Sequence, residues 1–176
     1  MSALAPPVYP ADHPVHQLAW RPCVGIILLN QDNLVFTGRR IADKLPAGAP
    51  LWQLPQGGID KWETPERAAF RELAEETGVT KAEIIYELPD WLSYDLPEVL
   101  IGKALKGRFR GQKQKWFAMR LLGDDSDIRL DAHKQIEFDD WAWRPLASCV
   151  DLVVDFKRPL YETLAERFAF LTNPQG

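Results

Sequence analysis

The segment from residue 57 to residue 79, GGIDKWETPERAAFRELAEETGV, contains the local signals of a short capped helix. Thr64 offers a hydroxyl N-cap, Pro65 suits the first helical position, and Glu66 places an acid near the positive end of the helix dipole. Gly78 can adopt the left-handed conformation that ends a helix. The segment therefore predicts a helix of roughly three to four turns.

One face of this predicted helix is acidic and another is apolar. Glu72, Glu75 and Glu76 are spaced i, i+3 and i+4, so their carboxylates share a face. Ala69 and Leu73 form a separate apolar stripe that needs a sheet to cover. Like charges at this spacing destabilise a helix, and an oxygen-loving divalent cation would offset the repulsion. The alternative is a solvated acidic face, which is the usual role of a run of charges.

The spacing of the whole segment is more specific than its helix signals. Its fixed positions are Gly57, Glu63 after five residues, and then, after seven more, Arg71-Glu72-Leu73, Glu75-Glu76 and Gly78-Val79 with single-residue gaps. This spacing resembles the Nudix box, the signature of hydrolases that cut nucleoside diphosphates linked to another group. A chance match at these positions has a probability on the order of one in a billion per start site. Many family members carry glycine where Trp62 precedes Glu63, which leaves room for a different loop conformation here.

Composition limits the class of protein. The chain has 176 residues, enough for one domain with a core, and its 46% hydrophobic and 26% charged residues are those of a globular protein. No apolar run approaches the length of a membrane span, and the N-terminus lacks the regions of a signal peptide. Cys23 and Cys149 suggest neither a disulfide framework nor a metal cluster. We expect both to be buried in a cytoplasmic protein.

Charge is distributed unevenly along the chain. The net charge of −4 argues against a general nucleic-acid binder. Residues 103–115 nevertheless contain six basic residues and no acid, whereas residues 124–140 are strongly acidic. A basic stretch beside a metal-binding helix suits a polyphosphate or the 5′ end of an RNA. An exposed loop with solubilising lysines is an equally good interpretation of this feature alone.

The remaining sequence predicts one layered domain, residues 19–172, after an irregular arm at residues 1–18. Apolar and β-branched runs predict strands at 21–29, 34–37, 51–54, 83–87, 91–95, 115–122 and 137–144. Prolines and glycine at 41–50 indicate a loop. A short helix is expected at 146–150 and an amphipathic helix at 158–171. These elements predict an α/β fold, a mixed sheet covered by helices on both faces in an α/β/α sandwich, which the resemblance identifies as a Nudix fold.

The resemblance extends from about residue 20 to about residue 170. Five further blocks are similar to the branch that comprises the bacterial RNA pyrophosphohydrolases and the dinucleoside polyphosphate hydrolases: residues 21–25 (RPCVG), 52–58 (WQLPQGG), 91–97 (WLSYDLP), 111–117 (GQKQKWF) and 137–141 (EFDDW). The block at 111–117 is the most telling of these.

This branch implies roles for particular residues. Metal ligands correspond to Glu72, Glu75, Glu76 and Glu137, with Gly57 bringing backbone close to the metal or phosphate, and Arg71 pairs with Glu63 to fix the loop against the helix. Arg40 corresponds to a nucleotide contact, and Phe156 and Lys157 to positions near the base and phosphate. Further phosphate or ribose contacts are expected at Arg21, Tyr94, Gln112 and Lys113. The alternatives are core packing for Phe156 and surface ion pairs for the two arginines.

The implied activity is hydrolysis of a phosphoric anhydride with Mg²⁺, or with Mn²⁺ or another divalent cation. On RNA, a 5′-triphosphate end would become a 5′-monophosphate end. The alternative substrate is a dinucleoside polyphosphate, with diadenosine tetraphosphate giving ATP and AMP. A Nudix-like domain without catalysis is disfavoured because all the box glutamates are present. Protein partners and oligomeric state stay open.

Overall fold

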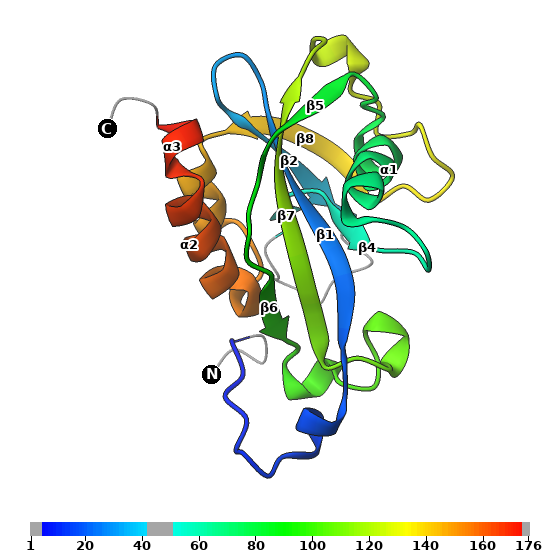
Figure 1. Ribbon diagram of the computed structural model, residues 1–176, viewed down its shortest axis with the longest axis vertical. Coiled ribbons are helices and arrows are strands. Elements are labelled where there is room, and N and C mark those ends of the chain that lie inside the picture. The colour runs from blue at the N-terminus through cyan, green and yellow to red at the C-terminus, as the bar shows by residue number, and fades with distance from the viewer. Residues whose placement is uncertain (1–4, 42–50, 174–176) are drawn as a thin grey trace.

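A computed structural model describes residues 5–41 and 51–173 of the protein. Most of the expected loop at 41–50, and the first four residues of the arm, lie outside the described residues. Helices flank the two sides of a central sheet, with α1 (Pro65–Thr77) on one side and α2 (Arg158–Arg167) and α3 (Ala169–Thr172) on the other (Figure 1). The predicted α/β/α layering is therefore confirmed.

The sheet is mixed and contains eight strands, whose main path runs β3-β2-β1-β7-β5. The central pair, β1 and β7, is parallel, and the other pairs are antiparallel. The bounds are β1 Trp20–Leu29, β2 Val35–Arg40, β3 Trp52–Gln53, β4 Gln56–Gly58, β5 Ala82–Glu87, β6 Leu92–Asp95, β7 Gly111–Leu121 and β8 Phe138–Arg144.

Two hydrophobic cores form because successive side chains of a strand point to opposite faces. On β1, Ile26 and Leu28 join the core beneath α1, whereas Ile27 and Leu29 join the core beneath α2. Strand β7 alternates in the same way from Trp116 to Leu121. The apolar stripe of α1, which includes Ala69 and Leu73, is buried in the first core as its spacing predicted. Residues 22–29 of β1 and 116–119 of β7 are consequently continuous apolar runs.

Strands β1 and β2 separate after their shared turn, and this separation creates room for the functional site. The two strands pair in register at Leu29 and Val35. Further along, β1 pairs with β4 at residues 23–25, while β2 pairs with β3 and β8. The β3–β4 segment therefore lies between two diverging strands, and it carries backbone and side chains into the gap.

The ends of α1 follow the sequence prediction. The Thr64 hydroxyl accepts a hydrogen bond from the Arg67 amide at 3.3 Å, and Pro65 is the first helical residue. At the other end Gly78 has a φ of 76°, and its amide donates to the Ala74 carbonyl at 2.9 Å. These caps fix where the acidic face of the helix begins and ends.

Three element predictions need correction. The strand expected at 51–54 is limited to β3 at Trp52–Gln53, and the sequence did not predict the next strand, β4, in which Gly58 pairs with Cys23 of β1. Strand β7 begins at Gly111, within the basic segment, because its first residues pair with both β1 and β6. The C-terminal helix is broken at Phe168, where φ is −106° and ψ is 8°, and the bend places this buried ring edge-on against Tyr86.

Other expectations concern the arm, the cysteines and membranes. The described part of the arm is irregular except for a 3-10 helix, η1 (Pro14–Gln17), and the Tyr9 hydroxyl donates to the Leu96 carbonyl.

Cys23 and Cys149 are both buried and free, as expected. Burial raises the pKa of the Cys23 thiol to about 11. Within residues 5–41 and 51–173, we find no helix with the length and apolarity needed to span a bilayer.

Candidate active site

A cleft of about 480 Å³ lies where β1 and β2 separate. Of the residues predicted to act in the site, most line this cleft although they come from distant parts of the chain. They are Arg21, Arg40, Gly57, Glu72, Glu75, Glu76, Tyr94, Gln112, Glu137, Phe156 and Lys157. The fold therefore brings together four carboxylates and three cationic side chains around one cavity.

The acidic wall of the cleft consists of Glu72, Glu75 and Glu76 from α1, with Glu137 from the residue preceding β8. Glu76 is only 6% exposed. Burial raises its pKa well above the usual value, the negative charges of Glu72 and Glu137 raise it further, and a hydrogen bond from the Gln56 amide opposes the shift. The pKa of Glu72 is also raised, chiefly by burial. Carboxylates held this closely repel one another, so the wall favours a bound cation.

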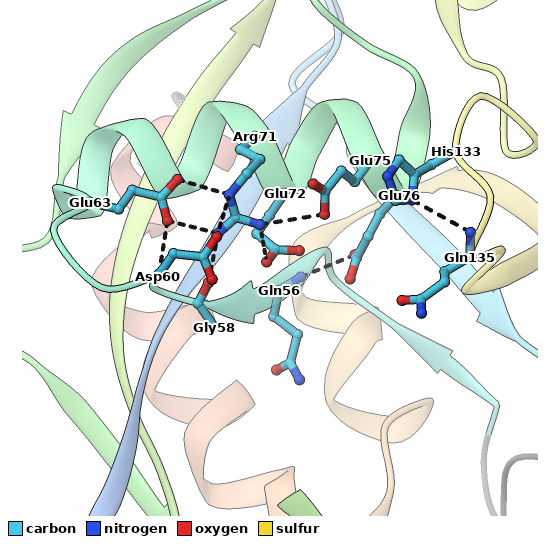
Figure 2. A network of polar contacts seen from close by, with 10 residues as sticks. All are labelled: Gln56, Gly58, Asp60, Glu63, Arg71, Glu72, Glu75, Glu76, His133 and Gln135. Carbon is cyan, nitrogen blue, oxygen red and sulfur yellow. Dashed lines mark hydrogen bonds and ion pairs between the residues drawn. The ribbon is translucent and has the colours of Figure 1, made fainter.

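Arg71 anchors the acidic wall to the loop before α1 (Figure 2). Its guanidinium donates two hydrogen bonds of 2.8 Å to the two oxygens of Glu63, which confirms the expected pair. It also donates at 2.8 Å to the Gly58 carbonyl and to Glu72 Oε1. A longer contact of 3.4 Å reaches Glu75. Arg71 does not line the cleft itself, so its effect on the site is exerted through the carboxylates that it orients.

The two glycines of β4 allow side chains to approach the backbone closely. A side chain on Gly57 would overlap the carboxylate of Glu72, and one on Gly58 would overlap the guanidinium of Arg21. Neither position needs a left-handed φ, so the requirement is for space. Gly57 therefore contributes by letting the Glu72 carboxylate lie against β4.

An aromatic and cationic corner closes another part of the cleft. Phe156 and Lys157 belong to η7 (Asp155–Lys157), and the Phe156 ring lies 5.7 Å from the Tyr94 ring, centroid to centroid. Lys157 Nζ lies 3.4 Å from Gln53 Oε1. Lys157 is 4% exposed, and burial, with the nearby charge of Arg40, lowers its pKa to about 7. Binding of an anion would favour the charged form of this lysine.

The basic side chains of segment 103–115, all of which the structure describes, do not reach the cleft. None of the six basic residues of segment 103–115 lines it: Arg110 pairs with Asp95, Lys115 pairs with Glu87, and Lys113 is an exposed residue of β7. The lining that this segment provides is uncharged, from Ala104, Leu105 and the side-chain amide of Gln112. Arg39 pairs with Asp139, whereas its neighbour Arg40 enters the cleft. The positive charge expected from the basic segment therefore comes from single residues on other elements.

Several lining residues were not predicted from the sequence. Gln53 and Gln56 lie in a block that resembles the family, but the resemblance assigns no role to them. His133 and Gln135 occupy the segment before β8, where the surrounding acids gave no signal of a site. Leu96, Leu100, Ala104 and Val154 add apolar surface, and only the tertiary fold reveals their position.

The residues present fit a divalent cation by their chemistry. Four carboxylates supply the hard oxygen ligands that Mg²⁺ and Mn²⁺ prefer. Across the described ranges, however, no three acidic, histidine or cysteine side chains are gathered as a preformed metal-binding group. Arg71 holds Glu72 and Glu75, and Glu76 accepts a hydrogen bond from the Gln56 amide at 3.2 Å. Side-chain rotation of these glutamates would complete a ligand set.

Comparison with known proteins identifies the class. The NUDIX domain family matches residues 19–164, which is most of the chain. The chain therefore belongs to the Nudix hydrolase family, whose members generally use divalent metal cations.

Individual relatives indicate which members of the family this chain resembles. The chain is 49% identical over 162 residues to an RNA pyrophosphohydrolase of Mesorhizobium japonicum, which covers 89% of this chain and 94% of that protein. It is 49% identical over 160 residues to an RNA pyrophosphohydrolase of Brucella ovis, covering 88% and 90%. Among solved structures, the E. coli dihydroneopterin triphosphate pyrophosphohydrolase matches with a TM-score of 0.59 and 18% identity, over 85% of this chain and 99% of that one. A C. elegans Ap4A hydrolase matches with a TM-score of 0.57 and 18% identity, over 86% and 98%. At that identity the solved structures support the fold alone.

Proposed function

We propose that this protein is an RNA pyrophosphohydrolase, which removes pyrophosphate from 5′-triphosphorylated RNA and leaves a 5′-monophosphate end. The observation that carries the proposal is one cleft with four carboxylates on one wall and Arg21, Arg40 and Lys157 around the rest. That arrangement suits a polyphosphate held between cations on the acidic wall and fixed positive charges opposite. The similarity to RNA pyrophosphohydrolases over most of the chain supports RNA as the substrate.

Mg²⁺ is the proposed cofactor, held by Glu72, Glu75, Glu76 and Glu137 beside the backbone of Gly57. When bound, such a cation offsets charge on phosphate oxygens and lowers the pKa of water. Mn²⁺ or another divalent cation would serve the same oxygen ligands. The raised pKa of Glu76 supports the assignment, since the charge repulsion behind part of that shift would be relieved by a cation.

The protein side chains carry the remaining steps. Water attacks phosphorus, a P–O bond forms, and the bond to the departing pyrophosphate breaks. The proton released from the water passes to a carboxylate oxygen, for which Glu72 is our first choice and Glu137 our second. Burial raises the pKa of Glu72 and so makes it a better proton acceptor. Arg40 and Lys157 offset charge that develops on the leaving group, which is an electrostatic contribution.

The remaining proposals follow from the same features. The proposed substrate contacts that line the cleft are Arg21, Tyr94, Gln112 and Phe156, whereas Lys113 lies outside the lining and is not supported as a contact.

Residues 19–172 are proposed to form a single catalytic domain, in which one sheet joins strands from Trp20 to Arg144. Free buried cysteines suit a cytoplasmic protein.

The deciding experiment compares two substrates at one enzyme concentration with Mg²⁺ present. We expect release of pyrophosphate from triphosphorylated RNA with a higher kcat/KM than cleavage of diadenosine tetraphosphate. The reverse ranking would replace the proposal with a dinucleoside polyphosphate hydrolase. Turnover of neither substrate would leave a Nudix domain with another substrate and would overturn both.

A further inference from the structure

Three side chains on one face of β7 form a polar chain that connects the hydrophobic core to the cleft. Gln112, Gln114 and Trp116 are two residues apart along the strand, so they point the same way. Gln114 and Trp116 are fully buried, and Gln112 is 4% exposed and lines the cleft. A side chain on Gly25 would overlap the Trp116 ring, so this glycine gives the indole its place.

The hydrogen bonds among these side chains are all donated in one direction, from Trp116 towards the cleft. Trp116 Nε1 donates to Gln114 Oε1 at 3.0 Å. Gln114 Nε2 then donates to Gln112 Oε1 at 2.7 Å and to Gln56 Oε1, from β4, at 2.8 Å. Gln112 and Gln56 line the cleft, and we call this part of its lining the amide wall.

The chemistry of tryptophan fixes that direction. An indole N–H can only donate, so the Gln114 side-chain carbonyl must face it. The Gln114 amide group must then face away, where its two N–H groups meet the carbonyl oxygens of Gln112 and Gln56. Those two glutamines are in turn oriented with their own NH₂ groups outward. Of the described residues, none accepts a hydrogen bond from either NH₂ group, and both glutamines line the cleft.

We infer that Trp116 and Gln114 are positioning residues, which make the cleft wall at Gln56 and Gln112 a donor-only surface for phosphate oxygens of the substrate. Phosphate oxygens are acceptors without hydrogens to donate, so a wall fixed as donor is complementary to them. Arg21, paired in register with Gln112 and lining the same cleft, adds positive charge at this place. Neutral donors held in advance bind without the reorientation that free amides would undergo. This inference rests on the proposed function, since it assigns the polyphosphate of that substrate to this wall.

Gln114→Glu is the variant that reverses the orientation of Gln56 and Gln112. A carboxylate can accept from Trp116 but cannot donate, so Gln56 and Gln112 would turn their NH₂ groups inward and show carbonyl oxygens to the cleft. Binding of tripolyphosphate with Mg²⁺, measured by calorimetry, should weaken about tenfold, because hydrogen bonds to a charged ligand are lost. Gln114→Met removes the constraint without reversing it, and about a threefold loss is expected. Gln31→Met, at a glutamine bonded to the Leu121 carbonyl outside the cleft lining, is the matched control.

A mutant cycle separates orientation from the effect of a buried charge. Gln114→Glu is introduced into wild type and into the Gln56→Met, Gln112→Met double variant. If the glutamate acts by turning the two amides, its effect on tripolyphosphate binding disappears in the double variant. An equal loss in both backgrounds would overturn the inference, because it would show a general charge effect. Melting temperatures of all variants identify any that fail to fold, and Gln114→Met then gives the same test without an added charge.

The ligand source is tested with adenosine in parallel with tripolyphosphate. Weakened tripolyphosphate binding with unchanged adenosine binding supports the assignment to phosphate. Weakened adenosine binding alone would assign the wall to a base carbonyl and overturn the assignment. Both measurements use binding, so they stand even if RNA turnover is not detected, and the two proposals can fail separately.

Discussion

The two walls of the cleft are organised by opposite means. On the acidic wall, Arg71 binds Glu72 and Glu75 through charged hydrogen bonds and joins them to Glu63 of the preceding loop, all within one short stretch of chain. On the amide wall, buried neutral groups orient Gln112 and Gln56, which come from strands far apart in sequence. The carboxylates of the acidic wall repel one another, and a bound cation would relieve that repulsion. On the amide wall, the side-chain carbonyl oxygens of Gln56 and Gln112 already accept hydrogen bonds from Gln114. Under the proposed assignments, one cleft would combine a surface that attracts a cation with a surface whose donors are already oriented for an anion.

The sharpest way to test the role of the acidic wall is Glu76→Gln. The change keeps shape and removes one charge from a buried position beside Glu72 and Glu137. We expect kcat to fall about a thousandfold, the scale of losing a key charged group in an active site. Melting temperature should hold or rise, since burial disfavours the charged form. Glu83→Gln, an exposed acid on β5, is the control, and near-normal turnover of Glu76→Gln would remove the metal-helix assignment.

Arg71→Lys tests whether the acidic wall depends on geometry as well as charge. Lysine keeps the positive charge but cannot make the paired bonds to both oxygens of Glu63 while also reaching Gly58. We expect turnover to fall about thirtyfold, consistent with roughly 2 kcal/mol from lost charged hydrogen bonds. The control Arg67→Lys changes an exposed arginine on the same helix. Equal activity of the two variants would contradict the anchoring role.

Gly57→Ala tests the junction between the acidic wall and β4. The added methyl group would occupy the place of the Glu72 carboxylate, which is the flexible end of a side chain. Turnover should fall about tenfold, because small misplacements of reacting groups are costly, while the melting temperature changes little. The measurement is kcat beside thermal unfolding, and a large loss of stability with normal kcat would reverse this interpretation.

Lys157→Met tests how much the buried ammonium group of Lys157 destabilises the folded protein. Burial lowers the pKa of Lys157 from an ordinary 10.5 to about 7, so the folded protein binds fewer protons here than the unfolded chain between those values. The resulting penalty is full below pH 7 and disappears as pH rises towards 10.5. The variant should therefore be more stable than wild type at pH 6, with a smaller advantage at pH 9. Denaturant unfolding at both pH values measures the difference, and a pH-independent difference would contradict the shift.

The smallest expected effect is at Trp62, outside both walls. Its φ is 71° and its side chain is 90% exposed, so the loop holds the left-handed backbone that glycine adopts without strain. Trp62→Gly should stabilise the fold by up to about 1 kcal/mol, the cost of a side chain in that conformation. Chemical denaturation measures the change, and a clear destabilisation would show that the exposed ring makes a stabilising contact.

The sequence predicted the acidic wall better than the amide wall, and the reason is physical. Helix caps, the spacing of Glu72, Glu75 and Glu76, and the pairing of Arg71 with Glu63 are local, so a short motif contains them. Gln112 was expected at the site from resemblance, but the roles of Gln114 and Trp116 depend on the parallel pairing of β7 with β1. The basic segment misled the prediction because charge along the sequence does not say which side chains are already paired, as Arg110 and Lys115 are.

The most direct measurement is a crystal structure with Mn²⁺ and a non-hydrolysable nucleoside polyphosphate, in which anomalous scattering locates the metal. We expect Mn²⁺ in direct contact with carboxylate oxygens of the acidic wall, between that wall and the phosphates. Metal peaks confined to other surfaces, with Glu72, Glu75 and Glu76 bonded only to protein while the nucleotide occupies the cleft, would contradict it.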